Sequence, residues 1–232
     1  MSKIAVVLGV GPGIGAAVAR RFAKEGFTVA LAARTKDKLL ALEKEINDAG
    51  GKAISVQIDA GNTESIINGF SEIKSRVGNP DVFVYNVGSF KYGSIEKLTT
   101  EDYESAWRNN CLGAITASQQ VLPHMLSQNK GTIILTGATA SMRGSVNFSP
   151  FAVGKFGLRA FAQSLAREYY PKGIHVAHVV IDGQVNVSKE TTRPLDEMLN
   201  PVEIANTYWN LYQQDKTAWT HELELRTNKE KW

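Results

Sequence analysis

The sequence predicts an α/β fold: a doubly wound parallel sheet of about seven strands with helices on both faces. Short unbroken runs of Val, Ile, Leu and Ala, typical of strands buried on both faces, alternate with longer stretches of helical periodicity. The first such run opens directly into a glycine-rich loop followed by a helical pattern. With 232 residues, 43% of them hydrophobic, the chain is long enough for one large core, and we expect a single domain over residues 1–232.

The first strand is predicted over residues 3–10 and runs into a glycine-rich loop at 9–15, after which a helical pattern continues to Gly26. Glycines at these places allow a tight turn and bring backbone N–H groups close to a pyrophosphate at the positive end of the helix. An ordinary glycine-rich loop is the alternative. The candidate cofactor-binding residues in this loop are Gly9, Gly11, Gly13, Ile14 and Gly15.

The second strand, over residues 27–33, is followed by Arg34, and no acidic residue occurs before Asp37. In dinucleotide-binding folds a carboxylate near this point bonds the adenosine ribose, whereas an arginine suits the additional phosphate of NADP. We therefore expect NADP rather than NAD. The alternative is that Arg34 is a solvated loop charge.

Helical spacing over 39–49 ends at a Gly-Gly pair, and a third strand over 53–58 leads to Asp59. The Asp59 carboxylate either accepts a hydrogen bond from the adenine amino group or caps its own loop, and both interpretations stay open. Asp59 and the neighbouring Ala60 join the candidate cofactor-binding residues.

A helical pattern over 66–77 precedes a fourth strand over 81–87, which ends in Asn86 followed by Val87 and Gly88. An asparagine amide and a glycine at the carboxyl edge of the sheet can brace the central strands and leave room for the ribose of a cofactor. Asn86 and Gly88 are therefore cofactor-binding candidates.

A long helix is predicted over residues 100–125, and a fifth strand over 132–136 follows it. Asn110 interrupts the apolar pattern of this helix. Because an unpaired buried amide is costly, Asn110 either bonds a water or a backbone group near the site, or it faces solvent.

The stretch over 137–161 leads into a second long helix, and this helix is predicted to continue to Tyr169. Four-residue spacing places Phe151 and Lys155 on one face of this helix. A tyrosine at the first position would make an acid–base pair with the lysine, but phenylalanine has no proton to donate.

The sixth strand, over 174–181, is followed by Gly183 and Val185, which we add to the cofactor-binding candidates. The polar segment over 186–200 is either a movable lid over the site or a plain surface excursion. The last predicted elements are a helix over 201–214 and an edge strand over 222–226.

Composition excludes several classes of function. The net charge is only +3 with scattered lysines and arginines, so we expect no nucleic-acid partner. No apolar run approaches the roughly 18 residues of a membrane span, and we assign no metal site. The single Cys111 excludes an internal disulfide, and the apolar run that begins at Ile4 leaves no room for a removable signal peptide. We therefore expect a cytoplasmic protein.

Along essentially its full length the chain resembles the short-chain dehydrogenase/reductase family, whose fold is Rossmann-like. The residues that carry the resemblance, in the order and spacing of the family, are Gly9, Gly13, Gly15, Asn86, Gly88, Asn110 and Lys155. In that family a tyrosine exchanges a proton with the substrate oxygen and a serine holds this oxygen. A lysine binds the nicotinamide ribose and lowers the tyrosine pKa, and an asparagine keeps a water in the proton path.

Placed on this sequence, the tyrosine position is Phe151 and the serine position, thirteen residues earlier, is Ala138. Lys155 and Asn110 remain as the catalytic candidates. The chain thus resembles an atypical branch of the family with an altered active site. Smaller departures from the family pattern occur at Leu8, Pro12, Val87, Asp182, Val187 and Ser188.

Three functions are compatible with such a site. The first is an NADP-dependent oxidoreductase acting on a carbonyl or alcohol, with a different proton source such as Thr139, Ser141 or Tyr92. The second is an NADP-binding homologue without hydride transfer, a sensor or a partner subunit. The third is lysine-assisted addition or elimination in the same cleft. The substrate is an unidentified small molecule, and a partly apolar pocket is indicated by Phe90, Met142 and Phe148.

The resemblance also implies self-association. Family members commonly pair through two long helices, which correspond here to residues 100–125 and 151–169. We therefore expect a homodimer or homotetramer.

Overall fold

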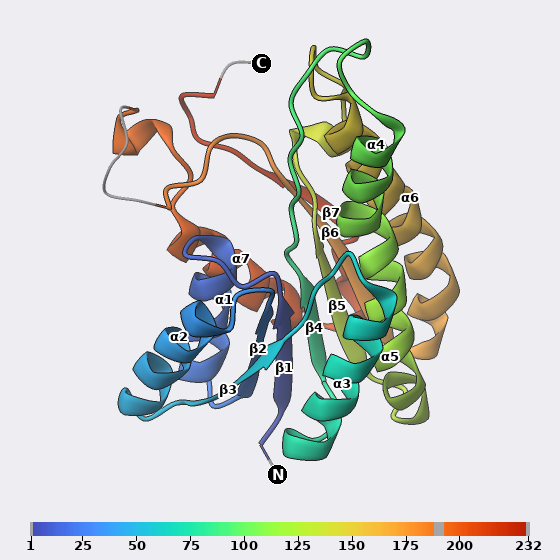
Figure 1. Ribbon diagram of the computed structural model, residues 1–232. Coiled ribbons are helices and arrows are strands. Elements are labelled where there is room, and N and C mark those ends of the chain that lie inside the picture. Colours follow the sequence, from blue (N-terminus) through green and yellow to red (C-terminus); the bar gives the residue numbers. More distant parts are fainter. Residues whose placement is uncertain (1, 188–192, 231–232) are drawn as a thin grey trace.

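The computed structural model describes residues 2–187 and 193–230 (Figure 1). Its strands form one seven-stranded sheet in the order β3-β2-β1-β4-β5-β6-β7, and every neighbouring pair is parallel. The predicted α/β fold class is therefore confirmed. The strands are β1 (Ile4–Leu8), β2 (Thr28–Ala33), β3 (Lys52–Gln57), β4 (Val82–Tyr85), β5 (Gly131–Thr136), β6 (Ile174–Ile181) and β7 (Glu222–Leu225).

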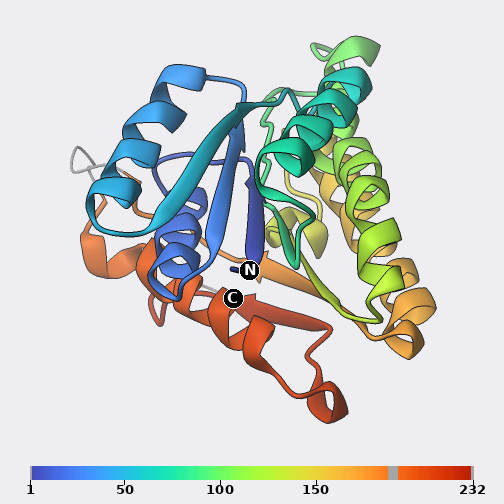
Figure 2. The same cartoon turned by 90° about the horizontal axis from the view of Figure 1, so that it is seen from below.

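Helices cover both faces of this sheet, as Figure 2 shows from below: α1, α2 and α7 lie on one face, and α3, α5 and α6 on the other. Among the described residues no helix is long and apolar enough to cross a membrane. The helices are α1 (Ile14–Lys24), α2 (Lys36–Asp48), α3 (Thr63–Val77), α4 (Thr100–Trp107), α5 (Gly113–Ser127), α6 (Ser149–Tyr169) and α7 (Pro201–Gln213), with a π-helical turn η1 (Arg108–Leu112) and short 3₁₀ turns η2 (Thr139–Ser141), η3 (Tyr170–Lys172), η4 (Leu195–Glu197) and η5 (Lys216–Ala218).

The alternation of side chains along β1 explains why its sequence is apolar at every position. Ala5 and Val7 pack into the core beneath α1, α2 and α7, whereas Val6 and Leu8 pack into the core beneath α3, α5 and α6. Both cores are built from buried aliphatic and aromatic side chains, many of them with no exposure to water. The strand is therefore buried on both faces, as its unbroken run of apolar residues predicts.

The order of the strands fixes the position of the functional site. β1 lies between β2 and β4, so the chain winds away from it in both directions. In open α/β sheets the loops that leave the carboxyl ends of two such strands separate and create a crevice. The glycine loop after β1 and the segment after β4 border this crevice.

The helix predicted over 100–125 is interrupted by the π-helical turn at Arg108–Leu112. The hydroxyl of Tyr85, at the end of β4, donates a 2.5 Å hydrogen bond to the backbone oxygen of Asn109 within this turn. A single wide turn of this kind leaves carbonyl groups free for such partners. Helical periodicity does not reveal the interruption, because the partner comes from a distant strand.

Candidate active site

β1 ends where the chain turns sharply against the end of β4. Gly9 has a φ of +99°, a conformation that favours glycine. A Cβ on Gly9 would lie 2.6 Å from the backbone carbon of Asn86. The Asn86 side chain in turn donates through Nδ2 to the Gly9 carbonyl oxygen at 2.9 Å. Glycine at this position is therefore a steric requirement, and Asn86 braces the two central strands.

The glycine loop and the start of α1 form an open backbone cradle. No atom lies within 4 Å of the position that a Cβ on Gly11 would take, whereas a Cβ on Gly15 would lie 2.7 Å from the Gly9 oxygen. No side chain caps α1 at Gly13, so the N–H groups of Ile14 and Gly15, the first two of the helix, have no acceptor, whereas that of Ala16 donates to the Gly11 oxygen at 3.0 Å. Such donors at the positive end of a helix fit a pyrophosphate.

A cavity of about 620 Å³ extends along the crevice and includes this cradle. All the cofactor-binding candidates except Asp59 line it. Sequence reasoning missed several further lining residues, among them Thr35, Lys38, Ser89 and Gln184. For Lys38 a signal was available, because it lies four residues after Arg34 at the start of α2.

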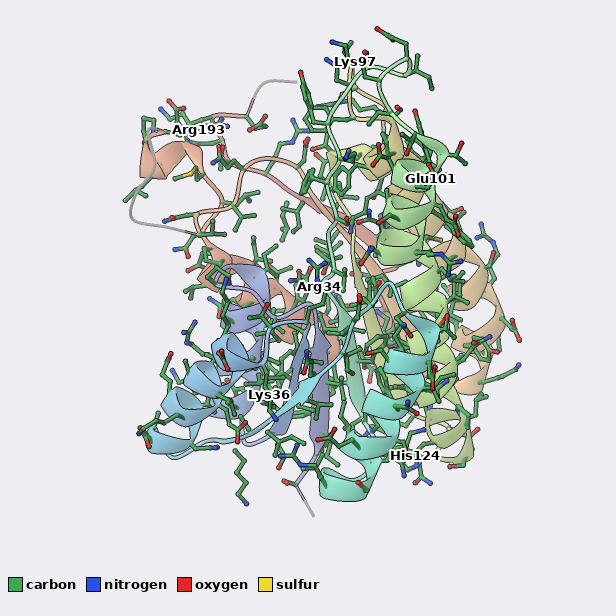
Figure 3. All side chains as sticks on the ribbon, in the orientation of Figure 1. Arg34, Lys36, Lys97, Glu101, His124 and Arg193 are labelled. Atoms are coloured by element: carbon green, nitrogen blue, oxygen red, sulfur yellow. The ribbon has the colours of Figure 1, made fainter. Side chains whose placement is uncertain are left out.

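Arg34 lies at the carboxyl edge of the sheet, beside the end of β2 (Figure 3). Its side chain is exposed and makes no ion pair with any described residue. Asp59 is placed differently: its Oδ1 accepts from the Gly61 N–H at 2.9 Å. This is the loop-capping contact, and Asp59 lines only a smaller hollow that it shares with Arg34.

Lys155 is buried in the wall of the cavity on α6. Its Nζ donates to the backbone oxygens of Val87 at 3.0 Å and Thr136 at 2.8 Å. Burial lowers the pKa of Lys155 to about 7. Nζ also lies 5.8 Å from the centre of the Phe151 ring, so these two side chains share a helix face. An ammonium has three N–H donors, and one is left for a ligand.

Asn110 lies in the π-helical turn and is fully buried. Its Oδ1 accepts from the Ser89 N–H at 3.1 Å, and its Nδ2 donates to the oxygens of Ser89 at 3.0 Å and Ala106 at 2.8 Å. Asn110 therefore bonds backbone groups near the site and does not face solvent. Asn110 thereby fixes the segment after β4 that lines the cavity.

Apolar side chains form the wall of the cavity at the end near Lys155. Phe151 is buried and stacks on Phe90, with ring centroids 4.1 Å apart and an angle of 28° between the planes. Ala138 lines the same end. At the two positions where the family resemblance places a tyrosine and a serine, the cavity wall therefore carries no hydroxyl group.

The alternative proton donors have other partners. The Thr139 hydroxyl donates to the buried carboxylate of Asp182, which also bonds Arg226. Ser141 is fully buried, and its Oγ accepts from the Ala138 N–H at 3.1 Å. Tyr92 also lies outside the cavity lining.

The start of the segment over 186–200 lies against the glycine cradle. A Cβ on Gly13 would lie 2.6 Å from Cγ1 of Val187, and Val187 lines the cavity. Farther on, Arg193, which Figure 3 labels, forms ion pairs with Glu197 and Glu230 at 3.4 Å each. Ser188 and most of the central part of the expected lid lie outside the described residues.

Comparison with known proteins identifies the class to which this fold and cavity belong. The family model for short chain dehydrogenases matches residues 3–194. The chain is 30% identical over 199 residues to the 3-oxoacyl-[acyl-carrier-protein] reductase of Bos taurus, a match that covers 86% of this chain and 81% of that protein. The chain belongs to the short-chain dehydrogenase family.

Solved structures extend the likeness over nearly the whole chain. A short-chain dehydrogenase from Rhodopseudomonas palustris is 37% identical and has a TM-score of 0.84, covering 97% of this chain and 98% of that one. An alcohol dehydrogenase from the archaeon Thermococcus sibiricus, complexed with 5-hydroxy-NADP, is 25% identical and has a TM-score of 0.90, covering 100% and 99%.

Proposed function

We propose that this protein is an NADP(H)-dependent oxidoreductase that transfers hydride to or from a small molecule, at a carbonyl, an alcohol or an equivalent carbon bonded to nitrogen. The observation that carries the proposal is a single cavity whose lining extends from Arg34 past the open glycine cradle to Lys155 and Phe151. A nucleotide at the cradle and a substrate at the Phe151 end would then share one space.

The basic residues at one end of the cavity support NADP. Arg34 and Lys38 line it, and the position that follows β2 carries no carboxylate to bond a ribose. The solved alcohol dehydrogenase that this chain resembles is complexed with 5-hydroxy-NADP, which agrees with this preference. In the proposal, Arg34 and Lys38 hold the additional phosphate of NADP, and the first N–H groups of α1 hold the pyrophosphate.

The chemistry divides between cofactor and protein. NADPH, when bound, supplies hydride. The remaining N–H of Lys155 holds a ribose hydroxyl, and Asn110 fixes the loop that forms the cavity wall. Holding two reactants in line lowers a barrier by about 7–11 kcal/mol. The loss of a general acid costs only about 10²–10⁴ in rate, so a site without the usual tyrosine and serine retains catalytic power.

Fluorescence titration of the purified protein with NADPH and NADH tests the cofactor assignment. We expect tighter binding of NADPH, and Arg34→Ala should weaken it about tenfold with little effect on NADH. Lys36→Ala is the matched control, because Lys36 is an exposed cation two residues away and does not line the cavity (Figure 3). No binding of either nucleotide would contradict the proposal.

A second candidate function is an NADP-binding homologue without hydride transfer, acting as a sensor or partner subunit. It is favoured by the hydrocarbon at Ala138 and Phe151. The double variant Ala138→Ser/Phe151→Tyr restores both family groups. If this variant binds NADPH but turns over no compound in a broad panel, the pocket does not accept a substrate and the non-catalytic function is supported.

We also propose that the protein is a homo-oligomer. α4 and α6 pack side by side, and they expose Trp107, Val153 and Phe156 to solvent. Large apolar side chains gathered on neighbouring helices are typical of a surface that a partner covers. Sedimentation should therefore show a species larger than 25.4 kDa, and a purely monomeric protein would contradict this part of the proposal.

A further inference from the structure

The reaction end of the cavity presents an aromatic face. Phe90 lines the cavity and is 67% exposed, while its other side is stacked on the buried Phe151 ring at 4.1 Å. The π face of an aromatic ring carries partial negative charge and attracts a cation placed within about 6 Å of its centre. A ligand at this end therefore meets a surface that is apolar and favours positive charge.

The same end has few groups able to protonate a substrate. The Thr139 hydroxyl is directed to Asp182, and Thr136 Oγ1 shares a 2.8 Å hydrogen bond with the Tyr208 hydroxyl. Lys155 donates to two backbone oxygens, and the proposed function gives its third N–H to a ribose hydroxyl. Among the described residues that line the cavity, Ser89 has the one hydroxyl near Phe90 with no side-chain partner, and no carboxylate or imidazole lines the cavity to relay protons to it.

The shortage of proton donors at this end favours some hydride acceptors over others. When a neutral carbonyl carbon takes a hydride, its oxygen becomes an alkoxide that must be protonated or stabilised. An anion formed beside the hydrocarbon of Ala138 and Phe151 finds no hydroxyl donor on these two residues, and a charged oxygen without a donor from the protein is unfavourable. An acceptor that is already positive avoids this charge.

We propose that the substrate is a compound with a cationic C=N bond, an iminium ion, held against the exposed face of Phe90; this inference rests on the proposed hydride transfer. The iminium carbon gains the hydride, and the C=N π electrons become the lone pair of the amine nitrogen. An iminium cation and NADPH thus give a neutral amine and NADP⁺, with no proton taken up or released. In the reverse direction a tertiary amine is oxidised.

The electrostatics of Lys155 agree with a cationic substrate. Its Nζ lies 5.8 Å from the centre of the Phe151 ring and is turned toward the Val87 and Thr136 oxygens. These two carbonyl oxygens partly offset its charge.

Paired substrates test the inference. N-Methyl-3,4-dihydroisoquinolinium and two further N-alkyl iminium salts are each compared with a ketone of similar ring system and size, 1-tetralone in the first case, using NADPH deuterated at C4 and mass analysis of the product. We expect the protein to raise the rate of deuterium transfer over that of the uncatalysed reaction about 100-fold more for the iminium salt than for the ketone, since the ketone lacks a general acid. An equal or larger rate enhancement for the ketones overturns the iminium assignment and leaves the proposed oxidoreductase intact. If NADPH binds but no compound of either kind takes up deuterium, the hydride-transfer proposal fails as well.

Binding without cofactor provides a readout that is independent of turnover. Calorimetric titration of the nucleotide-free protein should show that Phe90→Leu weakens binding of the iminium salt about fivefold and alters binding of 1-tetralone much less. Tyr92→Leu is the matched control, because Tyr92 is a similarly exposed aromatic residue two positions away that does not line the cavity. Equal losses for both ligands in Phe90→Leu would contradict recognition of the positive charge.

Ser89→Ala addresses the remaining hydroxyl. If Ser89 were a proton donor to a carbonyl, the wild type would reduce ketones at a substantial rate. Ser89→Ala would then lower ketone reduction and leave iminium reduction unchanged. We expect instead that the rate enhancement for ketones is already about 100-fold below that for iminium salts and does not fall further in Ser89→Ala. A clear further loss would overturn the inference.

Discussion

The Nζ of Lys155 donates a 2.8 Å hydrogen bond to the backbone oxygen of Thr136, the last residue of β5. A second bond from the same atom reaches Val87, just beyond the end of β4. One buried cation thus connects α6 to the carboxyl ends of two neighbouring strands. It stabilises the cavity wall even before any nucleotide binds.

The pH dependence of stability should therefore reveal Lys155. Burial holds its pKa at about 7, below the ordinary lysine value of 10.5, so between these pH values the unfolded chain binds more protons than the folded one. The free energy of unfolding should rise with pH across this window. In Lys155→Met this rise should be absent. Urea unfolding of both proteins from pH 6.5 to about 9.5, without cofactor, measures the difference. Parallel curves, or the same loss of slope in the exposed variant Lys38→Met, would contradict the prediction.

Gly9 and Gly11 should respond differently to a methyl group. Gly9→Ala forces a Cβ to within 2.6 Å of the Asn86 backbone at a positive φ, and we expect a loss of about 1–3 kcal/mol in the free energy of unfolding. Gly11→Ala meets no atom within 4 Å, so the fold should keep its stability while the methyl group enters the cavity and weakens nucleotide binding. Thermal unfolding and NADPH titration separate the two effects. Equal stabilities of the two variants would argue against the close approach of β1 and β4.

Asn110→Leu should be strongly destabilising. The substitution keeps the volume but removes the side-chain hydrogen bonds to the Ser89 N–H and to the Ser89 and Ala106 oxygens, at a cost of about 3 kcal/mol. Asn109→Leu is the control, because the Asn109 side chain makes one exposed bond to the Ser105 oxygen and should cost less than about 1 kcal/mol. Chemical denaturation at constant pH measures both values, and similar losses would contradict the bracing role of Asn110.

Asp182→Leu tests the ionic contacts between β6 and β7. Asp182 is buried, accepts from the Thr139 hydroxyl and pairs with Arg226, so its replacement by Leu removes charge-assisted hydrogen bonds and should cost about 1.5–3 kcal/mol. Glu224→Gln removes a more exposed carboxylate that also contacts Arg226 at 2.8 Å, and it should cost less than about 1 kcal/mol. Denaturation midpoints of the two variants provide the comparison. A mild effect of Asp182→Leu would show that Arg226 retains adequate partners without it.

The strands and most helices could be predicted because their signals are local. β6 has the predicted bounds, and α7 differs by a single residue. In these segments the residues that pack against the neighbouring layer are apolar, and they recur in the sequence with the period of the helix or strand. The glycine cradle was predictable for a related reason, because only glycine fits the turn at Gly9.

Features that depend on distant partners were not predictable in this way. The π-helical turn depends on a contact between Tyr85 and Asn109, and the hydroxyl of Thr139 finds Asp182 across 43 residues of sequence. The stack of Phe90 on Phe151 likewise joins two segments that no local pattern connects. Spacing rules describe neighbours along one helix or strand, so they do not predict side-chain contacts between separate elements.

The arrangement of the sheet has a consequence for how the chain assembles. Because all neighbouring strands are parallel, no pair can close through a hairpin, and each pairing must wait for a crossover to form. The cavity draws residues from the first strand to the segment beyond the sixth, so an emerging chain has no complete nucleotide pocket until β6 has docked. Nucleotide affinity therefore reports the completion of folding, and a ribosome-bound fragment that stops after β5 should be as protease-sensitive with NADPH as without it.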